Sequence, residues 1–165
     1  MSTPQTAEAL AEREAVQDAL HRCILGLDSN DRPLWESSMS KSEETCFVAE
    51  PIMNVQGWDN VNTHLQRVFE LVTMHITSNV RVQLKSANTA SLTCHTVSYH
   101  VEPENAYKME ETSFTGYSLY DIDLVKDEGD GMWKIQKWRV KVIRTTGDPA
   151  TVGSAVAGLS PESSK

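Results

Sequence analysis

The second half of the chain consists of long stretches in which apolar and polar residues alternate, and this pattern constrains the fold most strongly. Between residues 79 and 85, Val80, Val82 and Leu84 fall on one side of an extended chain, with charged or amide residues between them. A period of two indicates strands that bury one face. The sequence predicts strands near residues 46–50, 74–85, 90–102, 112–126 and 132–145.

The first half of the chain has helical periodicity instead. Leu10, Val16, Leu20, Ile24 and Leu27 recur on one face of a helix, with charged residues between them. Similar patterns predict helices near residues 7–28, 31–38 and 58–73. Helices followed by long antiparallel strands are typical of an α+β fold.

Length and composition indicate one domain. The 165 residues, 39% hydrophobic and 23% charged, suit a single compact core. We expect a flexible N-terminal arm at residues 1–7 and a folded domain at 8–146. Residues 147–165 turn to Gly, Ala, Ser, Thr and Pro, which predicts a disordered tail.

The net charge, the N-terminal sequence and the cysteines indicate which partners and which cellular location to expect. The net charge of −8 disfavours nucleic acid, because proteins that bind a phosphate backbone gather positive charge. The polar, acidic N-terminus contains no signal peptide and no apolar run is long enough to cross a bilayer, so we expect a cytoplasmic protein without a membrane partner. Three widely spaced cysteines predict buried, reduced thiols rather than disulfides or a zinc site.

The best candidates for chemistry are His75 and His100, which open and close the first pair of long predicted strands. A histidine needs only a small environmental shift to act as a base or an acid near neutral pH. Asp28, at the end of the first helix, could orient His75 by accepting a hydrogen bond from its ring. Each has a structural alternative: Asp28 suits a helix-ending turn, and both histidines could donate to backbone carbonyls.

No other catalytic or metal-binding motif stands out. The histidines and carboxylates lack metal-ligand spacing, and there is no glycine-rich phosphate loop or nucleophile elbow. We therefore expect neither a metal nor a cofactor. Strand alternation puts five small or aromatic residues on the faces that could line a pocket with His100. These candidate substrate contacts are Thr96, Ser98, Phe114, Ser118 and Tyr120.

The order of these elements resembles the NTF2-like superfamily, particularly its SnoaL-like and scytalone-dehydratase-like members. The resemblance covers about residues 8–146. Asp28, His75 and His100 fall where the dehydratase has an Asp at the end of its first helix and two His on its long strands. The Gly-Met-Trp-Lys sequence at residues 131–134 resembles the Gly-x-Trp-Lys entry to that family's last strand.

The chain also departs from the dehydratase pattern. Leu27 stands where the dehydratase has a Tyr, Ser118 is the nearest match to an Asn, and the strand of Phe47 offers no counterpart to a carbonyl-polarising Tyr. We include Leu27 and Phe47 among the candidate substrate contacts. Because these positions differ, the substrate scytalone is not transferred to this chain.

The resemblance implies a cone, also described as a cystatin-like α+β barrel, in which a curved antiparallel sheet is wrapped by three helices around one apolar cavity. It further implies a cofactor-free dehydratase or isomerase acting on a small hydrophobic, polyketide-like or terpenoid-like intermediate. His75 would remove a proton and His100 would protonate a departing hydroxyl or an enolate.

Two alternatives remain open: a cyclase that uses the same proton transfer, and a non-catalytic binding or association module. Members of the superfamily commonly pair through the outer face of the sheet. We therefore expect a homo-oligomer, most simply a dimer, through Tyr99, Tyr117 and Leu119.

Overall fold

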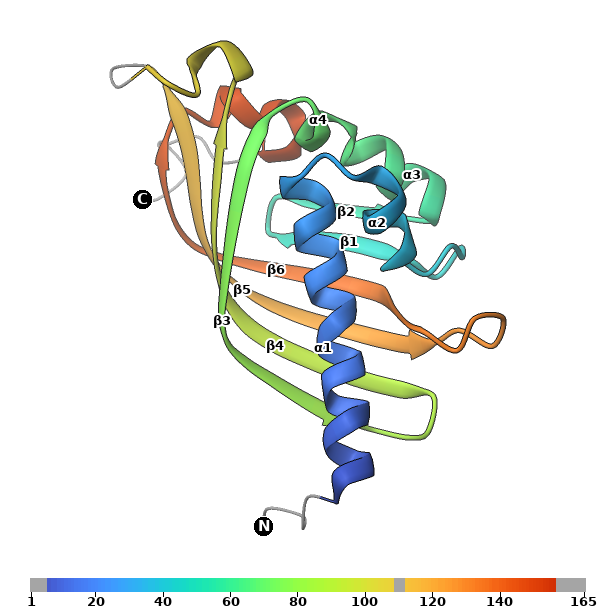
Figure 1. Ribbon diagram of the computed structural model, residues 1–165. Coiled ribbons are helices and arrows are strands. Elements are labelled where there is room, and N and C mark those ends of the chain that lie inside the picture. The colour runs from blue at the N-terminus through green and yellow to red at the C-terminus, as the bar shows by residue number, and fades with distance from the viewer. Residues whose placement is uncertain (1–5, 109–111, 157–165) are drawn as a thin grey trace.

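The computed structural model describes residues 6–108 and 112–156 (Figure 1). Most of the expected arm at residues 1–7 lies outside these ranges. The first helix already begins at Ala7, where the hydroxyl of Thr6 accepts a hydrogen bond from the Ala9 amide at 3.1 Å and caps the helix.

A single curved sheet of six strands in the described ranges forms one layer of the molecule, in the order β2-β1-β6-β5-β4-β3. The strands are β1 (Cys46–Glu50), β2 (Met53–Gln56), β3 (Val72–Leu84), β4 (Thr89–Val101), β5 (Ser113–Lys126) and β6 (Trp133–Gly147). β2 and β3 are the two edge strands and do not pair with each other, so the sheet does not close into a barrel. The α+β cone is confirmed.

The sheet is mixed rather than wholly antiparallel, which corrects the expectation. Four pairings are antiparallel, but β1 runs parallel to β6, with Phe47 opposite Trp138. A short turn fixes the antiparallel direction of a hairpin, whereas β1 and β6 lie far apart in the chain. No local signal therefore sets their relative direction.

The helices are α1 (Ala7–Asp28), α2 (Arg32–Ser37), α3 (Trp58–His64) and α4 (Gln66–Phe69). The expectation of one third helix over residues 58–73 is wrong in two respects. The helix divides at Leu65, and β3 begins at Val72 because Val72–His75 pair with Ser98–Val101 of β4. Val72 and Thr73, which the sequence assigns to the end of the helix, therefore belong to β3.

Bulges produce the sharp bend seen in Figure 1. The register of β3 with β4 shifts between Ser78 and Arg81, where Asn79 has a φ of +55°. The register of β5 with β6 shifts between Tyr117 and Ser118 and again between Asp123 and Leu124. An extra residue bends a strand and increases its twist. The sheet therefore curves around one face, and α1 lies across that face (Figure 1).

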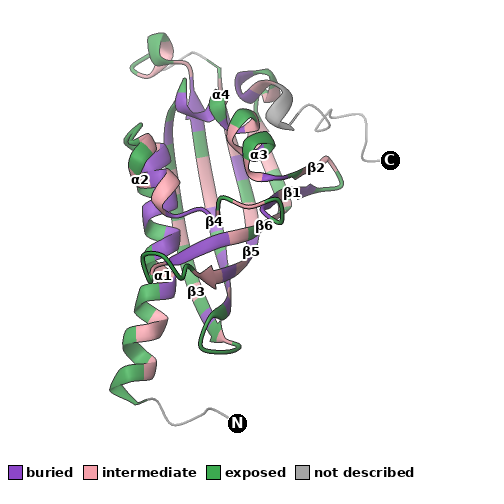
Figure 2. Ribbon diagram, turned by 90° about the vertical axis from the view of Figure 1, so that its right-hand side faces the viewer, coloured by how far each residue is buried: buried purple, intermediate pink, exposed green. Residues whose placement is uncertain are grey.

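The core lies between α1 and the concave face of the sheet. The second half of α1 buries Val16, Leu20, Ile24 and Leu27, whereas its first turns are exposed, and Leu10 keeps 48% of its surface accessible (Figure 2). In the part of the chain that the structure describes, no helix is both long and apolar enough to cross a membrane.

The first part of the expected tail, residues 147–156, is ordered, which corrects the expectation for these residues. Pro149–Val156 form a 3₁₀ segment, η2, beside α4, and Val152 is buried against Leu71 and Phe114. Arg67 donates a hydrogen bond to the carbonyl of Thr151 at 3.2 Å. Val152 therefore packs in the core, although most residues of this segment are small or polar. Residues 157–165 lie outside the described ranges.

Gly26 lets α1 and α2 approach closely. A Cβ at this position would lie 2.4 Å from the backbone nitrogen of Trp35, and Trp35 is fully buried against Trp58 and Phe69. Only a glycine permits this contact without moving α2.

We expect Gly26→Ala to destabilise the protein, although alanine is the better helix former by about 1 kcal/mol. Overpacking of a core typically costs about 1–3 kcal/mol, and each kcal/mol lowers Tm by about 2–4 °C at this size. Urea unfolding and thermal circular dichroism measure the change. The control is Gly129→Ala in an exposed turn, where the new Cβ would meet only the end of the Asp127 side chain. A Gly26→Ala protein as stable as the control would contradict this account.

Candidate active site

Asp28 and His75 are brought together where α1 ends against the start of β3. The Asp28 carboxylate lies 2.6 Å from Nδ1 of His75 through Oδ1 and accepts the His75 backbone amide at 2.8 Å through Oδ2. The hydroxyl of Thr73 donates to Oδ1 at 2.8 Å. Three donors thus hold the carboxylate in place.

This environment keeps Asp28 ionised. Burial alone would raise its pKa, but the hydrogen bonds from His75 and Thr73 and the charge of His75 outweigh burial and lower the pKa below its ordinary value. An ionised carboxylate at Nδ1 favours the tautomer that carries its proton there, which leaves Nε2 of His75 free to accept one. The His75 side chain is only 5% exposed.

Thr73 was missed in the sequence, although strand alternation could have found it. It lies two residues before His75 and therefore on the same inward face of β3. It pairs with His100 across the sheet.

His100 lies next to His75 but in a different electrostatic environment. The two ring centroids are 5.3 Å apart and the rings are nearly perpendicular. His100 is 7% exposed, and its Nδ1 is fully enclosed with no hydrogen-bond partner among the described residues. Burial, together with the charge of His75, lowers the pKa of His100 to about 3. His100 is therefore uncharged near neutral pH.

Both histidines line an apolar cavity of about 100 Å³ between the helices and the bent sheet. Six of the seven residues predicted to contact substrate line the same cavity: Leu27, Phe47, Ser98, Phe114, Ser118 and Tyr120. Asp28 is not part of this wall, since it supports His75 from behind. The three predicted catalytic residues therefore converge on one site.

Thr96 is the exception and corrects the expectation. It is 3% exposed, lies 3.7 Å from the Cys94 sulfur, and contacts the hydroxyl of Tyr120. Burial raises the pKa of Tyr120 above its ordinary value, so that hydroxyl stays protonated. Thr96 is therefore buried but is not part of the cavity wall.

Several wall residues were not predicted because they come from distant parts of the chain. The junction between α3 and α4 contributes Leu65 and α4 contributes Val68, while β6 contributes Trp138 and Thr145. Val152 reaches the cavity from η2, the segment expected to be disordered. Only the tertiary fold brings these side chains to the cavity.

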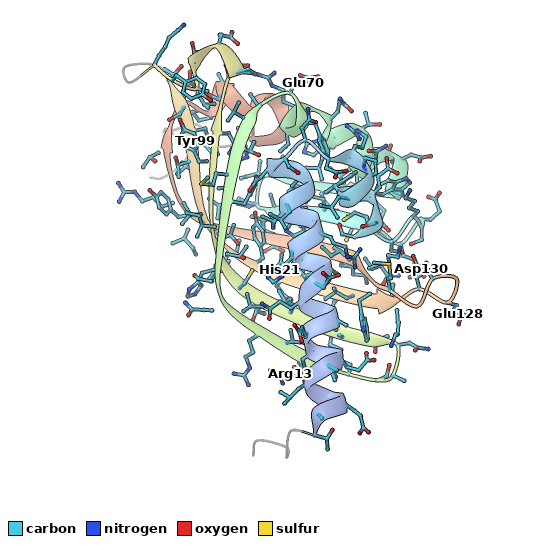
Figure 3. All side chains as sticks on the ribbon, viewed as in Figure 1. Arg13, His21, Glu70, Tyr99, Glu128 and Asp130 are labelled. Carbon is cyan, nitrogen blue, oxygen red and sulfur yellow. The ribbon has the colours of Figure 1, made fainter. Side chains whose placement is uncertain are left out.

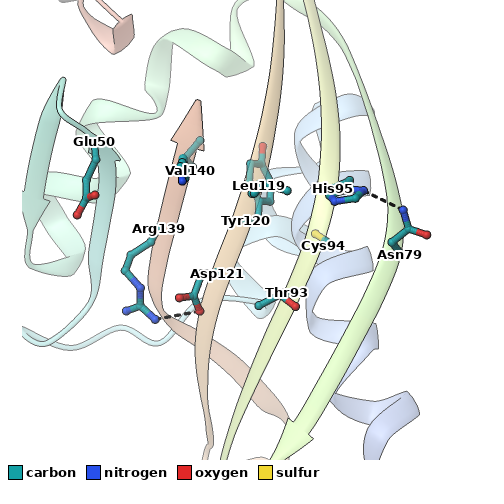
Figure 4. Close-up of a pocket in the computed structure, with 11 residues that line it drawn as sticks. Glu50, Asn79, Thr93, Cys94, His95, Leu119, Tyr120, Asp121, Arg139 and Val140 are labelled. Atoms are coloured by element: carbon teal, nitrogen blue, oxygen red, sulfur yellow. Dashed lines mark hydrogen bonds and ion pairs between the residues drawn. The ribbon is translucent and has the colours of Figure 1, made fainter. Parts of the chain in front are cut away.

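A larger hollow, of about 510 Å³, lies on the opposite face of the sheet (Figure 4). Four of its polar groups pair with each other: Arg139 bonds Asp121 at 3.2 Å, and Asn79 bonds His95 at 2.8 Å. None of the three predicted catalytic residues lines it. We therefore assign the candidate site to the inner cavity.

The cysteines do not take part in the site as nucleophiles. Cys23, Cys46 and Cys94 are buried and unpaired, as predicted, and burial raises the pKa of Cys23 to about 12. Within residues 6–108 and 112–156, no three His, Cys, Asp or Glu side chains form a group that could hold a metal ion.

Comparisons with known proteins agree with this architecture. Residues 8–139 match the family model of the SnoaL-like domain. The "Terrestric acid biosynthesis cluster protein E" of Penicillium crustosum is 30% identical over 146 residues, which cover 88% of this chain and 92% of that protein.

Several solved structures have the same fold. A protein of Novosphingobium aromaticivorans assigned as a scytalone dehydratase superposes with a TM-score of 0.73 at 21% identity, over 87% of this chain and 92% of its own. A hexachlorocyclohexane dehydrochlorinase of Novosphingobium barchaimii gives 0.64 at 20% identity, over 85% and 92%. An NTF2-like superfamily protein of Salmonella enterica gives 0.67 at 15% identity, over 87% and 98%. The chain belongs to the SnoaL-like family and has the NTF2-like fold.

Proposed function

We propose that this protein is a cofactor-free dehydratase or isomerase that acts by His/Asp acid-base catalysis on a small hydrophobic, polyketide-like or terpenoid-like biosynthetic intermediate. The observation that carries the proposal is the Asp28–His75 pair at the wall of an apolar cavity. The relative named for a biosynthesis cluster supports the pathway class. The dehydratase and dehydrochlorinase neighbours support an elimination.

In the first step, Nε2 of His75 removes a proton from the carbon next to a carbonyl group. The electron pair of that C–H bond moves toward the carbonyl oxygen and gives an enolate. Asp28 stabilises the imidazolium that forms, as a carboxylate does when it orients a histidine base. The apolar wall excludes water, which strengthens this charge pair.

In the second step, the same proton leaves His75. In a dehydration it joins the departing hydroxyl, which leaves as water while the enolate electrons form a new double bond. In an isomerisation it goes to another carbon of the conjugated system. Because His100 is uncharged, it serves as a hydrogen-bond partner of a substrate oxygen or relays the proton from His75 to the departing hydroxyl or the enolate.

A cyclase would share the first step, since an enolate held in a shaped cavity can attack a second carbon of its own chain. The third possibility is a non-catalytic binding module, in which the cavity holds a ligand without proton transfer. Replacement of both histidines separates these classes, because a binding module would keep its ligand and an enzyme would lose turnover.

We also propose that two copies associate through an outer apolar patch, defined as Met74, Ile76, Tyr99, Tyr117 and Ile143. Leu119, which the sequence also suggested for this contact, is only partly exposed and is left out of the patch. The side chains of the patch point away from the helices, and Tyr99 projects from the outer face in Figure 3. Strand pairing places Met74 beside Tyr99, and the patch extends from β3 to β6. Contiguous exposed apolar residues of this kind mark association surfaces.

The first prediction from the proposed chemistry concerns the base. His75→Ala should slow proton transfer by ~10²- to 10⁴-fold, and Asp28→Asn should also be severe because it removes the charge that stabilises the imidazolium. Exchange of the α-hydrogens of cyclohexanone in D₂O, followed by NMR, measures the step without the natural substrate. EDTA should not change the rate.

The matched control for this exchange is His95→Ala, which removes a histidine from the outer face of the sheet. Circular dichroism checks that each variant is folded. A folded His75→Ala protein with undiminished exchange would overturn the mechanism. Wild-type exchange no faster than the buffer would favour the binding module.

The second prediction concerns the pH dependence of stability. The folded pKa of His100, about 3, lies below the unfolded value of about 6.5, so the unfolded chain binds more protons between the two. The free energy of unfolding should therefore fall as pH drops through this window. Urea titrations at pH 7, 6, 5 and 4 should show a shallower fall for His100→Gln than for wild type. Equal slopes would show that His100 is not held neutral by the fold.

The third prediction concerns association. Ile76→Lys combined with Ile143→Lys should convert a dimer to the 18.4 kDa monomer in sedimentation velocity at micromolar concentration, because each lysine places a charge in an apolar contact. The control is Leu25→Lys, which lies on α1 and is similarly exposed. A wild-type protein that sediments only as a monomer would contradict the proposal.

A further inference from the structure

Four strands each contribute one residue to a row that crosses the floor of the cavity. His75 of β3 pairs with Ser98 of β4, Ser98 pairs with Gly116 of β5, and Gly116 pairs with Thr145 of β6. All four line the cavity. Because neighbouring strands lie about 4.8 Å apart, the row extends about 14 Å from the proposed base to Thr145.

Gly116 leaves a gap in the middle of this row. Its backbone does not have the positive φ that favours glycine, so conformation does not explain the residue. A Cβ there would lie 2.9 Å from Oγ of Ser98. The inward residues on either side of it along β5 are Phe114 and Ser118. The register of β5 with β6 shifts one residue later, between Tyr117 and Ser118. A glycine inside a strand also marks a place where another group approaches the backbone closely, and here the Ser98 hydroxyl leans over the glycine from one side.

Two hydroxyl groups flank the gap. Those of Ser98 and Thr145 make no side-chain hydrogen bond with another residue in the described ranges 6–108 and 112–156, and neither is fully enclosed. A hydroxyl can both donate and accept. The gap therefore has a polar group available at each side.

The size of the cavity limits what can occupy the gap. Leu27, Leu65 and Val68 form an apolar roof over a volume of about 100 Å³. An apolar protein cavity of about 150 Å³ holds one benzene molecule. The space above Gly116 therefore admits at most one ring, and that ring must lie flat against the glycine backbone.

We propose that Ser98, Gly116 and Thr145 form a subsite that receives one flat ring with oxygen substituents on two opposite edges. The ring lies over Gly116, with one oxygen at Ser98 and the other at Thr145. The direction in which the ring faces rests on the proposed function: its reacting edge lies toward His75. Thr145 and Gly116 thereby determine specificity at the far edge and the centre of the ring.

Two rings of the same shape test the subsite: p-xylene, which has no oxygen, and hydroquinone, which has one at each end. Binding is measured by calorimetry under nitrogen. Thr145→Val keeps the side-chain shape and removes the hydroxyl, so it should weaken hydroquinone by about 3- to 10-fold and leave p-xylene unchanged. Thr146→Val, on the opposite face of β6, is the matched control and should change neither affinity.

Gly116→Ala tests the gap itself. It should weaken both ligands at least tenfold while Tm changes little, because the Ser98 hydroxyl can turn away from the new Cβ and alanine has less backbone entropy to lose than glycine. Gly129→Ala is the control. Undiminished binding by Gly116→Ala, equal effects of Thr145→Val on both rings, or no binding of either ring to wild type would each overturn the proposal.

The binding measurement needs no turnover, so it separates this proposal from the proposed function. In a His75→Ala protein, the subsite predicts that the effect of Thr145→Val on hydroquinone persists. Loss of proton transfer with this selectivity retained supports both proposals. Normal proton transfer in His75→Ala would overturn the base while leaving the subsite in place.

Discussion

The carboxylate of Asp28 is the point on which both the fold and the site depend. It ends α1 and accepts the Thr73 hydroxyl, the His75 amide and the His75 ring, so it ties the helix to the edge strand of the sheet. A buried carboxylate with fewer donors would take up a proton, because desolvation raises its pKa. The same three hydrogen bonds that fix the position of the helix therefore also keep the charge that orients His75.

Local patterns predicted the strands well and the longer-range geometry poorly. Alternation placed β3 to β6 within about two residues of their observed ends, because the period of two persists along a half-buried strand. It could not show that β1 runs parallel to β6, since no turn links the two. It also could not show that the helix starting at Trp58 divides at Leu65 or that Val152 returns to the core.

For the candidate site too, local patterns were informative and long-range geometry could not be predicted. Alternation placed His100, Ser98 and Phe114 on faces that could line a pocket, and the family resemblance added His75. The structure brings all four to one cavity. Alternation failed for Thr96, because an inward-facing side chain can be buried in the core without reaching the cavity. Bulges displace strands by single residues, and their positions are set by tertiary packing rather than by a local sequence signal.

The apolar cavity gives its two histidines opposite characters. Low polarity disfavours a charge on His100, which has no carboxylate partner of its own, and lowers its pKa to about 3. The same low polarity strengthens the attraction between Asp28 and a protonated His75, because charges interact more strongly away from water. The ring centroids of the two histidines lie 5.3 Å apart, yet the two residues have different roles, because only His75 has a hydrogen-bonded carboxylate. A cavity that was more open to water would weaken both effects and make the two histidines alike.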